Sequence, residues 1–207
     1  MKYRYIFVDL DNTLLDFEAA EEYSFYYTAQ SRGLSFGEAE LERYQAINAP
    51  LWKMMERREI TKDALVVRRF RELFEELGIT GIDPEQYNAD YLNNLALCTR
   101  TIDGAEELCR FIHENGVLII ATNGVSATQH RRIAASGLEP WLDKVVVSDD
   151  AGAEKPDPRY FERAFEVSGA GDKSECIIIG DSLTSDIRGG QQFGIDTCWF
   201  NPKGKAL

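Results

Sequence analysis

Two aspartates near the N-terminus, Asp9 and Asp11, stand two positions apart directly after a short apolar run. The run, residues 3–8, is rich in β-branched and aromatic side chains and predicts a buried strand. In an open α/β sheet, ligands bind beyond the carboxyl ends of the strands, so both carboxylates are expected where chemistry takes place. Adjacent carboxylates repel each other unless a cation or a proton lies between them. Taken alone, the pair also fits a surface turn in which Asp and Asn cap a helix.

A second apolar run, residues 117–121, ends in the polar triplet Thr122-Asn123-Gly124. A hydroxyl, an amide and exposed backbone N–H groups at a strand end can bind phosphate oxygens, particularly where a helix begins. Taken alone, the triplet fits a polar turn in which glycine supplies backbone freedom. Beside the aspartate pair, it indicates a site for a phosphate group.

Lys155 follows the next apolar run and is flanked by two prolines, Pro156 and Pro158. The prolines stiffen the backbone and so restrict where the lysine lies. A cation fixed near the aspartates could neutralise them and hold a phosphate. The alternative for this residue alone is a solvated lysine before a helix that starts at Pro158.

The fourth apolar run, residues 176–179, leads into Gly180-Asp181 and, five residues later, Asp186. Aspartates beyond a strand end, without histidine, are the hard oxygen ligands that suit Mg²⁺. The alternative for Asp186 is an acidic residue at a helix start, where the helix dipole favours it. We expect these two aspartates to join Asp9 and Asp11 in a magnesium site.

The elements that must position these residues are short strands alternating with helices. After residue 103 helical segments alternate with runs at 117–121, 145–147, 176–179 and 197–200, which predicts βαβ units around a parallel sheet. Residues 16–99 show only helical periodicity and predict a four-helix bundle inserted after the first strand. The predicted organisation is a Rossmann-like α/β core, residues 1–15 and 100–207, with a helical cap, residues 16–99.

Composition limits the partners and the compartment of this 207-residue chain. Its net charge of −12 argues against a nucleic-acid polymer as partner, because phosphate contacts need clustered Lys and Arg. No run approaches the roughly eighteen apolar residues of a membrane span, so we expect no membrane partner. The four cysteines are widely spaced and form no C-x-x-C pair, which predicts reduced thiols, no zinc site and a cytoplasmic protein.

The four strand ends bear, in chain order, D-x-D-x-T, T-N-G, K-P and G-D-x-x-x-x-D. This combination resembles the haloacid dehalogenase superfamily over nearly the whole chain. The resemblance implies a Rossmann-like sheet, a helical cap inserted after the first motif, and a nucleophilic aspartate. It also implies a cap that moves to close over the leaving group and exclude water.

The resemblance assigns a role to each motif residue. Asp9 matches the nucleophile that forms an aspartyl-phosphate, and Asp11 matches the general acid that protonates the leaving alcohol and then activates water. Thr122 and the Asn123 backbone match the groups that hold the phosphoryl oxygens. Lys155 matches the lysine that stabilises both the nucleophile and the transferring phosphoryl group.

The same resemblance implies a Mg²⁺ cofactor. Its expected ligands are Asp9, the main-chain carbonyl of Asp11 and Asp181, with Asp186 acting directly or through water. The metal would screen the repulsion between an anionic nucleophile and an anionic substrate. Asp11 argues against a dehalogenase, whose leaving halide needs no proton.

Three stretches resemble the noncanonical pyrimidine 5′-nucleotidases more closely, which implies a nucleoside monophosphate substrate: residues 9–17, 155–161 and 180–202. Alternatives within the superfamily are a phosphoglycolate or sugar-phosphate phosphatase and a phosphomutase. A non-catalytic phosphate-binding protein is less consistent with four complete motifs. A pyrimidine base would favour an aromatic stacking partner, and the candidates are Phe17, Tyr23, Tyr26, Tyr27 and Trp52.

Overall fold

The computed structural model describes residues 2–204, and these residues divide into two compact units. One unit comprises the chain up to Phe17 together with the chain from Thr99 onward, and the other is Glu18–Cys98. The first unit holds all four motifs, and the second holds helices α2 to α4 and most of α1.

The first unit is built on a parallel five-stranded sheet in the described residues, with the strand order β3-β2-β1-β4-β5. In the centre of the sheet, Val8 of β1 pairs with Ile120 of β2 and with Ile179 of β4. The first motif therefore leaves the sheet between the second and the fourth. This arrangement confirms the predicted α/β class with a parallel sheet. The strands are β1 (Tyr5–Val8), β2 (Val117–Thr122), β3 (Lys144–Val147), β4 (Cys176–Gly180) and β5 (Asp196–Trp199).

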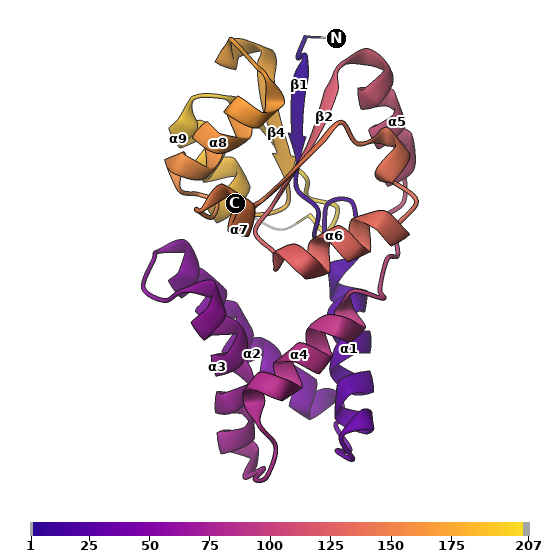
Figure 1. Ribbon diagram of the computed structural model, residues 1–207, viewed down its shortest axis with the longest axis vertical. Coiled ribbons are helices and arrows are strands. Elements are labelled where there is room, and N and C mark those ends of the chain that lie inside the picture. The colour runs from indigo at the N-terminus through magenta and orange to yellow at the C-terminus, as the bar shows by residue number, and fades with distance from the viewer. Residues whose placement is uncertain (1, 205–207) are drawn as a thin grey trace. The chain divides into compact units, whose positions relative to one another are not determined.

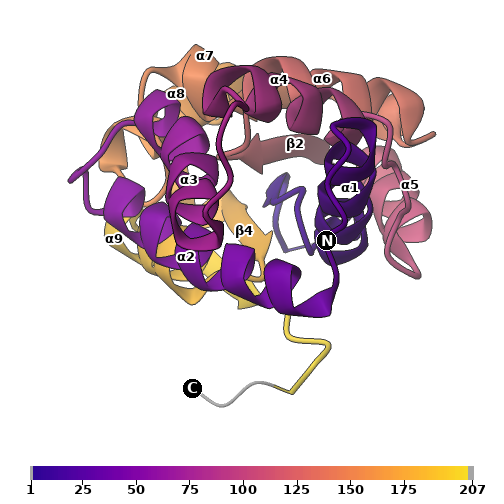
Figure 2. The same cartoon turned by 90° about the horizontal axis from the view of Figure 1, so that it is seen from below.

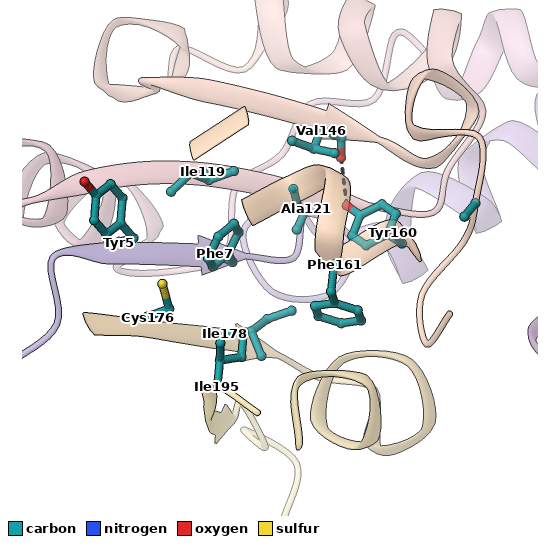
Figure 3. Packing of buried hydrophobic residues seen from close by; sticks show 12 residues of the cluster. Tyr5, Phe7, Ile119, Ala121, Val146, Tyr160, Phe161, Cys176, Ile178 and Ile195 are labelled. Carbon is teal, nitrogen blue, oxygen red and sulfur yellow. Dashed lines mark hydrogen bonds between the residues drawn. The ribbon is translucent and has the colours of Figure 1, made fainter. Parts of the chain in front are cut away.

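Alternating residues of the central strands bury the two faces of the sheet in separate cores. Tyr5 and Phe7 of β1 lie in one core with Tyr160 and Phe161 of α8 (Pro158–Ser168), as Figure 3 shows. The Tyr160 hydroxyl donates to the Val146 carbonyl at 2.9 Å, which ties α8 to β3. Both faces of the sheet must be apolar because helices cover each of them.

The opposite face packs against α5 (Ala105–Asn115) and α6 (Ser126–Ala135). Ile6 and Val8 of β1 belong to this second core with Cys109 of α5. Figure 1 shows α5 and α8 on opposite sides of β1 within this unit. The double-sided covering explains why the strands read as continuous apolar runs in the sequence.

Several short elements near the strand ends are not evident from the sequence. A short helix α7 (Ser148–Ala151) follows β3, and a π-helical turn at Leu183–Ile187 precedes α9 (Arg188–Phe193). Single 3₁₀ turns occur at Glu139–Trp141 and Lys173–Glu175. These segments are shorter than the window over which a helical period can be recognised, so the sequence pattern does not show them.

The second unit consists of helices with recognisable end signals. The Thr61 side chain caps α3 by accepting from the Ala64 N–H at 3.3 Å, and Gly78 ends that helix with φ +64°, as is typical of threonine before a helix and glycine after one. In both views α2 and α3 run side by side (Figures 1 and 2). The helices are α1 (Phe17–Ser31), α2 (Glu38–Glu56), α3 (Lys62–Leu77) and α4 (Pro84–Leu95). None of the helices within residues 2–204 is both long enough and apolar enough to cross a membrane.

An aromatic core containing one buried arginine holds this helical unit together. The Phe70 ring stacks on Tyr44 and meets Tyr91 edge-on, with ring centroids 5.4 and 5.2 Å apart. Arg69 is 2% exposed and donates to the Tyr44 hydroxyl at 3.1 Å and to Asn88 Oδ1 at 2.8 Å. These bonds and the surrounding rings satisfy a charge that would otherwise be costly to bury.

Candidate active site

Asp9 follows β1 at the carboxyl end of the sheet and contacts the buried lysine of the third motif. Lys155 Nζ lies 2.6 Å from Asp9 Oδ1, 2.6 Å from Asp186 Oδ1 and 2.6 Å from the Ala121 carbonyl oxygen. An ammonium group has three protons, so these three acceptors use all of them. The Lys155 side chain is 1% exposed, so the solvated lysine considered as an alternative is not what the fold produces.

The electrostatics of this pair follow from burial and neighbouring charge. Burial alone would lower the pKa of the Lys155 ammonium, but the carboxylates of Asp186 and Asp9 outweigh burial and raise that pKa. Burial also raises the pKa of the Asp9 carboxyl well above its usual value; Lys155 opposes this rise, and Asp186 and Asp11 add to it. Lys155 is therefore held in its protonated form, and positive charge near Asp9 favours the ionised form of that carboxyl.

The loop that carries Lys155 is fastened to the end of β2 by Asn123. The Asn123 side chain donates from Nδ2 to the Lys155 carbonyl at 2.8 Å and accepts from the Lys155 N–H at Oδ1, also at 2.8 Å. Asp157 then caps α8 by accepting from the Arg159 N–H at 3.0 Å. Since these bonds use the Asn123 side chain, its backbone is the part that remains for the predicted phosphate contact.

The fourth motif brings two further carboxylates to the same place. Asp9, Asp181 and Asp186 each offer one oxygen, and these three oxygens lie within 4.8 Å of one another. Asp186 is fully buried in the π-helical turn, and its second oxygen accepts from the Ser182 N–H at 3.1 Å. A Cβ atom on Gly180 would lie 2.3 Å from Asp186 Oδ2, so glycine is required there.

This carboxylate cluster fits a divalent metal ion. Three carboxylates lie close together and one lysine pairs with two of them, which leaves an excess of negative charge in a mostly buried place. The donor set consists of oxygens alone, which suits Mg²⁺ rather than zinc or copper. Both oxygens of Asp186 accept hydrogen bonds within the protein, one from Lys155 Nζ and the other from the Ser182 N–H.

Asp11 is held by two buried residues of α6 that were not predicted from the sequence. Gln129 Nε2 donates to Asp11 Oδ2 at 2.7 Å and to Thr122 Oγ1 at 2.8 Å. Arg132 forms an ion pair with Asp11 Oδ1 and is completely buried. The first two motifs therefore meet through the Gln129 amide. The sequence signal for these two residues was a polar pair at i, i+3 on an otherwise amphipathic helix directly after the T-N-G triplet.

The predicted aromatic candidates lie in different surroundings. Phe17 lies beneath the Arg132 guanidinium, 5.8 Å from the ring centroid, within the first unit. Tyr23 and Tyr27 stack on each other on α1 with centroids 5.5 Å apart, and each is 48% exposed. Tyr26 and Trp52 are half-buried in the helical unit.

The chain is similar in sequence to one known protein family and to proteins of named function. A family model described as haloacid dehalogenase-like hydrolase matches residues 3–194. The pyrimidine 5′-nucleotidase PynA of Streptococcus pneumoniae is 37% identical over 98% of this chain and 85% of its own length. The pyrimidine 5′-nucleotidase YjjG of Escherichia coli is 34% identical over 97% of this chain and 87% of its own length. These matches span both the first unit and the helical unit.

The fold is also similar to that of a solved structure. The HAD-hydrolase YfnB of Bacillus subtilis superimposes with a TM-score of 0.95 at 37% identity, covering 100% of this chain and 92% of that one. The YfnB crystal structure is described as bound to magnesium and as revealing interdomain movement. The sequence comparison and the structure comparison thus point to the same family.

Proposed function

This chain belongs to the haloacid dehalogenase-like hydrolases, and we propose that it hydrolyses pyrimidine nucleoside 5′-monophosphates through an aspartyl-phosphate on Asp9. Membership makes the protein an enzyme, as predicted from its motifs. The predicted Mg²⁺ cofactor is supported by the related YfnB, whose crystal structure is described as bound to magnesium. What we propose is the role of each site residue and the class of substrate.

The observation that carries the proposal is the contact between the buried ammonium of Lys155 and one oxygen of Asp9. Lys155 Nζ binds Oδ1 at 2.6 Å, which holds the carboxylate at the end of β1 and leaves the other oxygen for attack on phosphorus. The same ammonium would stabilise negative charge on the phosphoryl group as it is transferred. The proposed nucleophile and a fixed cation therefore lie side by side.

The presence of Asp11, two residues after the proposed nucleophile, favours phosphoryl transfer over dehalogenation as the reaction. In the first step an O–P bond forms at Asp9, the bond from phosphorus to the leaving oxygen breaks, and protonated Asp11 gives its proton to that oxygen. In the second step Asp11 takes a proton from water, which attacks phosphorus, and Asp9 and inorganic phosphate are released. Thr122 and the Asn123 backbone are the proposed partners of the phosphoryl oxygens.

The metal ligands are proposed from the carboxylate cluster. Asp9 and Asp181 would bind Mg²⁺ directly, together with the main-chain carbonyl of Asp11, and Asp186 would act directly or through water. Bound Mg²⁺ supplies positive charge that neutralises the phosphoryl oxygens and the crowded carboxylates. Chelation should therefore abolish phosphate release, and added Mg²⁺ should restore it.

The substrate class is supported by PynA and YjjG, both named pyrimidine 5′-nucleotidases. The test is Mg²⁺-dependent phosphate release from UMP, dUMP, dTMP, CMP, AMP, GMP, phosphoglycolate and several sugar phosphates. We expect kcat/KM to be highest for the pyrimidine nucleotides. Preference for phosphoglycolate or sugar phosphates would overturn the substrate class and leave the chemistry standing. No release from any ester would refute the proposed activity.

A further inference from the structure

We propose that Gln129 and Arg132 of α6 are positioning residues for this reaction: Gln129 fixes the direction in which Thr122 donates its proton, and both side chains hold Asp11 in place. The inference rests on the proposed function, because it concerns the groups that would bind the phosphoryl oxygens and protonate the leaving group. Neither residue belongs to the four motifs found in the sequence.

The hydrogen bonds of the Gln129 amide determine its orientation. Its oxygen accepts from Arg132 Nη1 at 3.1 Å, and since a guanidinium can only donate, the NH₂ end must point the other way. That end has two protons, and it has two acceptors, Asp11 Oδ2 at 2.7 Å and Thr122 Oγ1 at 2.8 Å. Gln129 is 1% exposed, so water does not compete for these bonds.

The Thr122 hydroxyl is thereby left with one way to act. Its oxygen accepts from Gln129 Nε2 at 2.8 Å and from the Gly124 N–H at 3.3 Å, which occupies both of its lone pairs. The single hydroxyl proton must then be donated to a third group. A phosphoryl oxygen, which only accepts, is the ligand that such a hydroxyl suits. Without Gln129, one lone pair of the hydroxyl oxygen would lose its donor, and the direction of the hydroxyl proton would no longer be fixed.

The Asp11 carboxylate is restrained at both oxygens. Arg132 pairs with Oδ1, while Gln129 donates to Oδ2. The Arg132 side chain is fully buried, whereas the Asp11 side chain remains 25% exposed. The donors thus hold the carboxylate from the protein side and leave part of it accessible. A general acid must lie within hydrogen-bond reach of the leaving group. Holding the Asp11 carboxyl in place therefore favours proton transfer to the leaving oxygen.

Gly124 supplies an independent indication that the position of Gln129 is specified. A Cβ atom at residue 124 would lie 2.4 Å from both Cδ and Nε2 of the Gln129 side chain. Any side chain there would push the amide away from Thr122 and Asp11. The glycine of the T-N-G motif thus makes room for a residue five positions further along the chain.

The test compares substrates that differ in their need for a proton. Alkyl phosphomonoesters need protonation of the leaving oxygen, whereas p-nitrophenyl phosphate releases a stable anion without it. Arg132→Met should lower kcat/KM for an alkyl ester about 10- to 100-fold, and for p-nitrophenyl phosphate less than about threefold. Gln129→Leu should lower kcat/KM for both esters, because it also frees the Thr122 hydroxyl, and should lower the alkyl value more.

The matched control is Arg131→Met, the same substitution at an exposed position of the same helix, which should leave both values unchanged. Circular dichroism and thermal melting check that each variant is folded. Should Arg132→Met fail to fold, Gln129→Leu keeps the Arg132–Asp11 pair and still tests the inference. An equal loss for both esters in both variants would overturn it, as would wild-type rates in Gln129→Leu. A wild-type protein inactive on both esters would instead refute the proposed function, and the inference with it.

Discussion

Gly180 ends β4 and lies against the carboxylate of Asp186, so Gly180→Ala tests how tightly the carboxylate cluster is built. The added Cβ would stand 2.3 Å from Asp186 Oδ2 and 2.4 Å from Cγ. These distances are about 1 Å short of ordinary van der Waals contact. The carboxylate must therefore move by about that amount or the strand must shift. Asp186 is fully buried, so no open space receives it.

The expected loss follows from the bonds that this movement disturbs. Asp186 accepts from Lys155 Nζ at 2.6 Å and from the Ser182 N–H at 3.1 Å. Removing a partner from a buried ion pair costs about 3–5 kcal/mol, and we expect about half of that for a displaced partner. The melting temperature should fall by about 4–8 °C. Misplacement of a catalytic group by 1 Å lowers kcat about 100-fold.

The assay measures phosphate release over a range of Mg²⁺ concentrations, together with urea unfolding. Gly171→Ala is the matched control, because residue 171 is exposed and a Cβ there meets no atom within 4 Å. The control should keep wild-type activity and stability, with a gain of at most about 1 kcal/mol. If Gly180→Ala behaved like this control, the close packing of Asp186 against the strand end would be refuted.

Three further predictions concern the nucleophile, the helical unit and the thiols. Asp9→Asn should lower phosphate release about 10⁴-fold or more and leave the circular dichroism spectrum intact; measurable turnover at the wild-type rate would remove the covalent mechanism. Arg69→Met should lower the free energy of unfolding by about 3 kcal/mol in urea, since buried acceptors lose their donor, and a loss below about 1 kcal/mol would contradict this. Burial raises the pKa of the Cys109 thiol to about 12 and that of Cys176 to about 11, so alkylation of the native protein should modify exposed Cys198 first. The buried thiols should react faster as the pH rises toward those values, and mass spectrometry that found Cys109 modified first would disprove the burial argument.

The sequence alone was sufficient for the sheet and for the motif residues. The runs of β1, β2 and β4 are continuous and apolar because both faces of the sheet are buried there, and each leads directly into a polar motif at the carboxyl edge of the sheet. Caps such as Thr61 and Gly78 marked helix ends through local hydrogen bonding and backbone preference. These features depend on residues close together in the chain, and a pattern in the sequence can record them.

Only the tertiary structure determined which side chains far apart in the sequence form ion pairs and hydrogen bonds with each other. Lys155 joins Asp9 and Asp186 across 146 and 31 positions, and Gln129 reaches Asp11 across 118. The packing of whole elements buries these groups and brings the carboxylates of Asp186 and Asp9 against Lys155, and those carboxylates raise the pKa of Lys155 although burial alone would lower it. The sequence shows which polar side chains follow the strands. The parallel register of the sheet and the position of α6 determine which of these side chains touch. Hydrogen bonds and buried ion pairs depend on distances between atoms, and only the packing of the whole fold sets those distances.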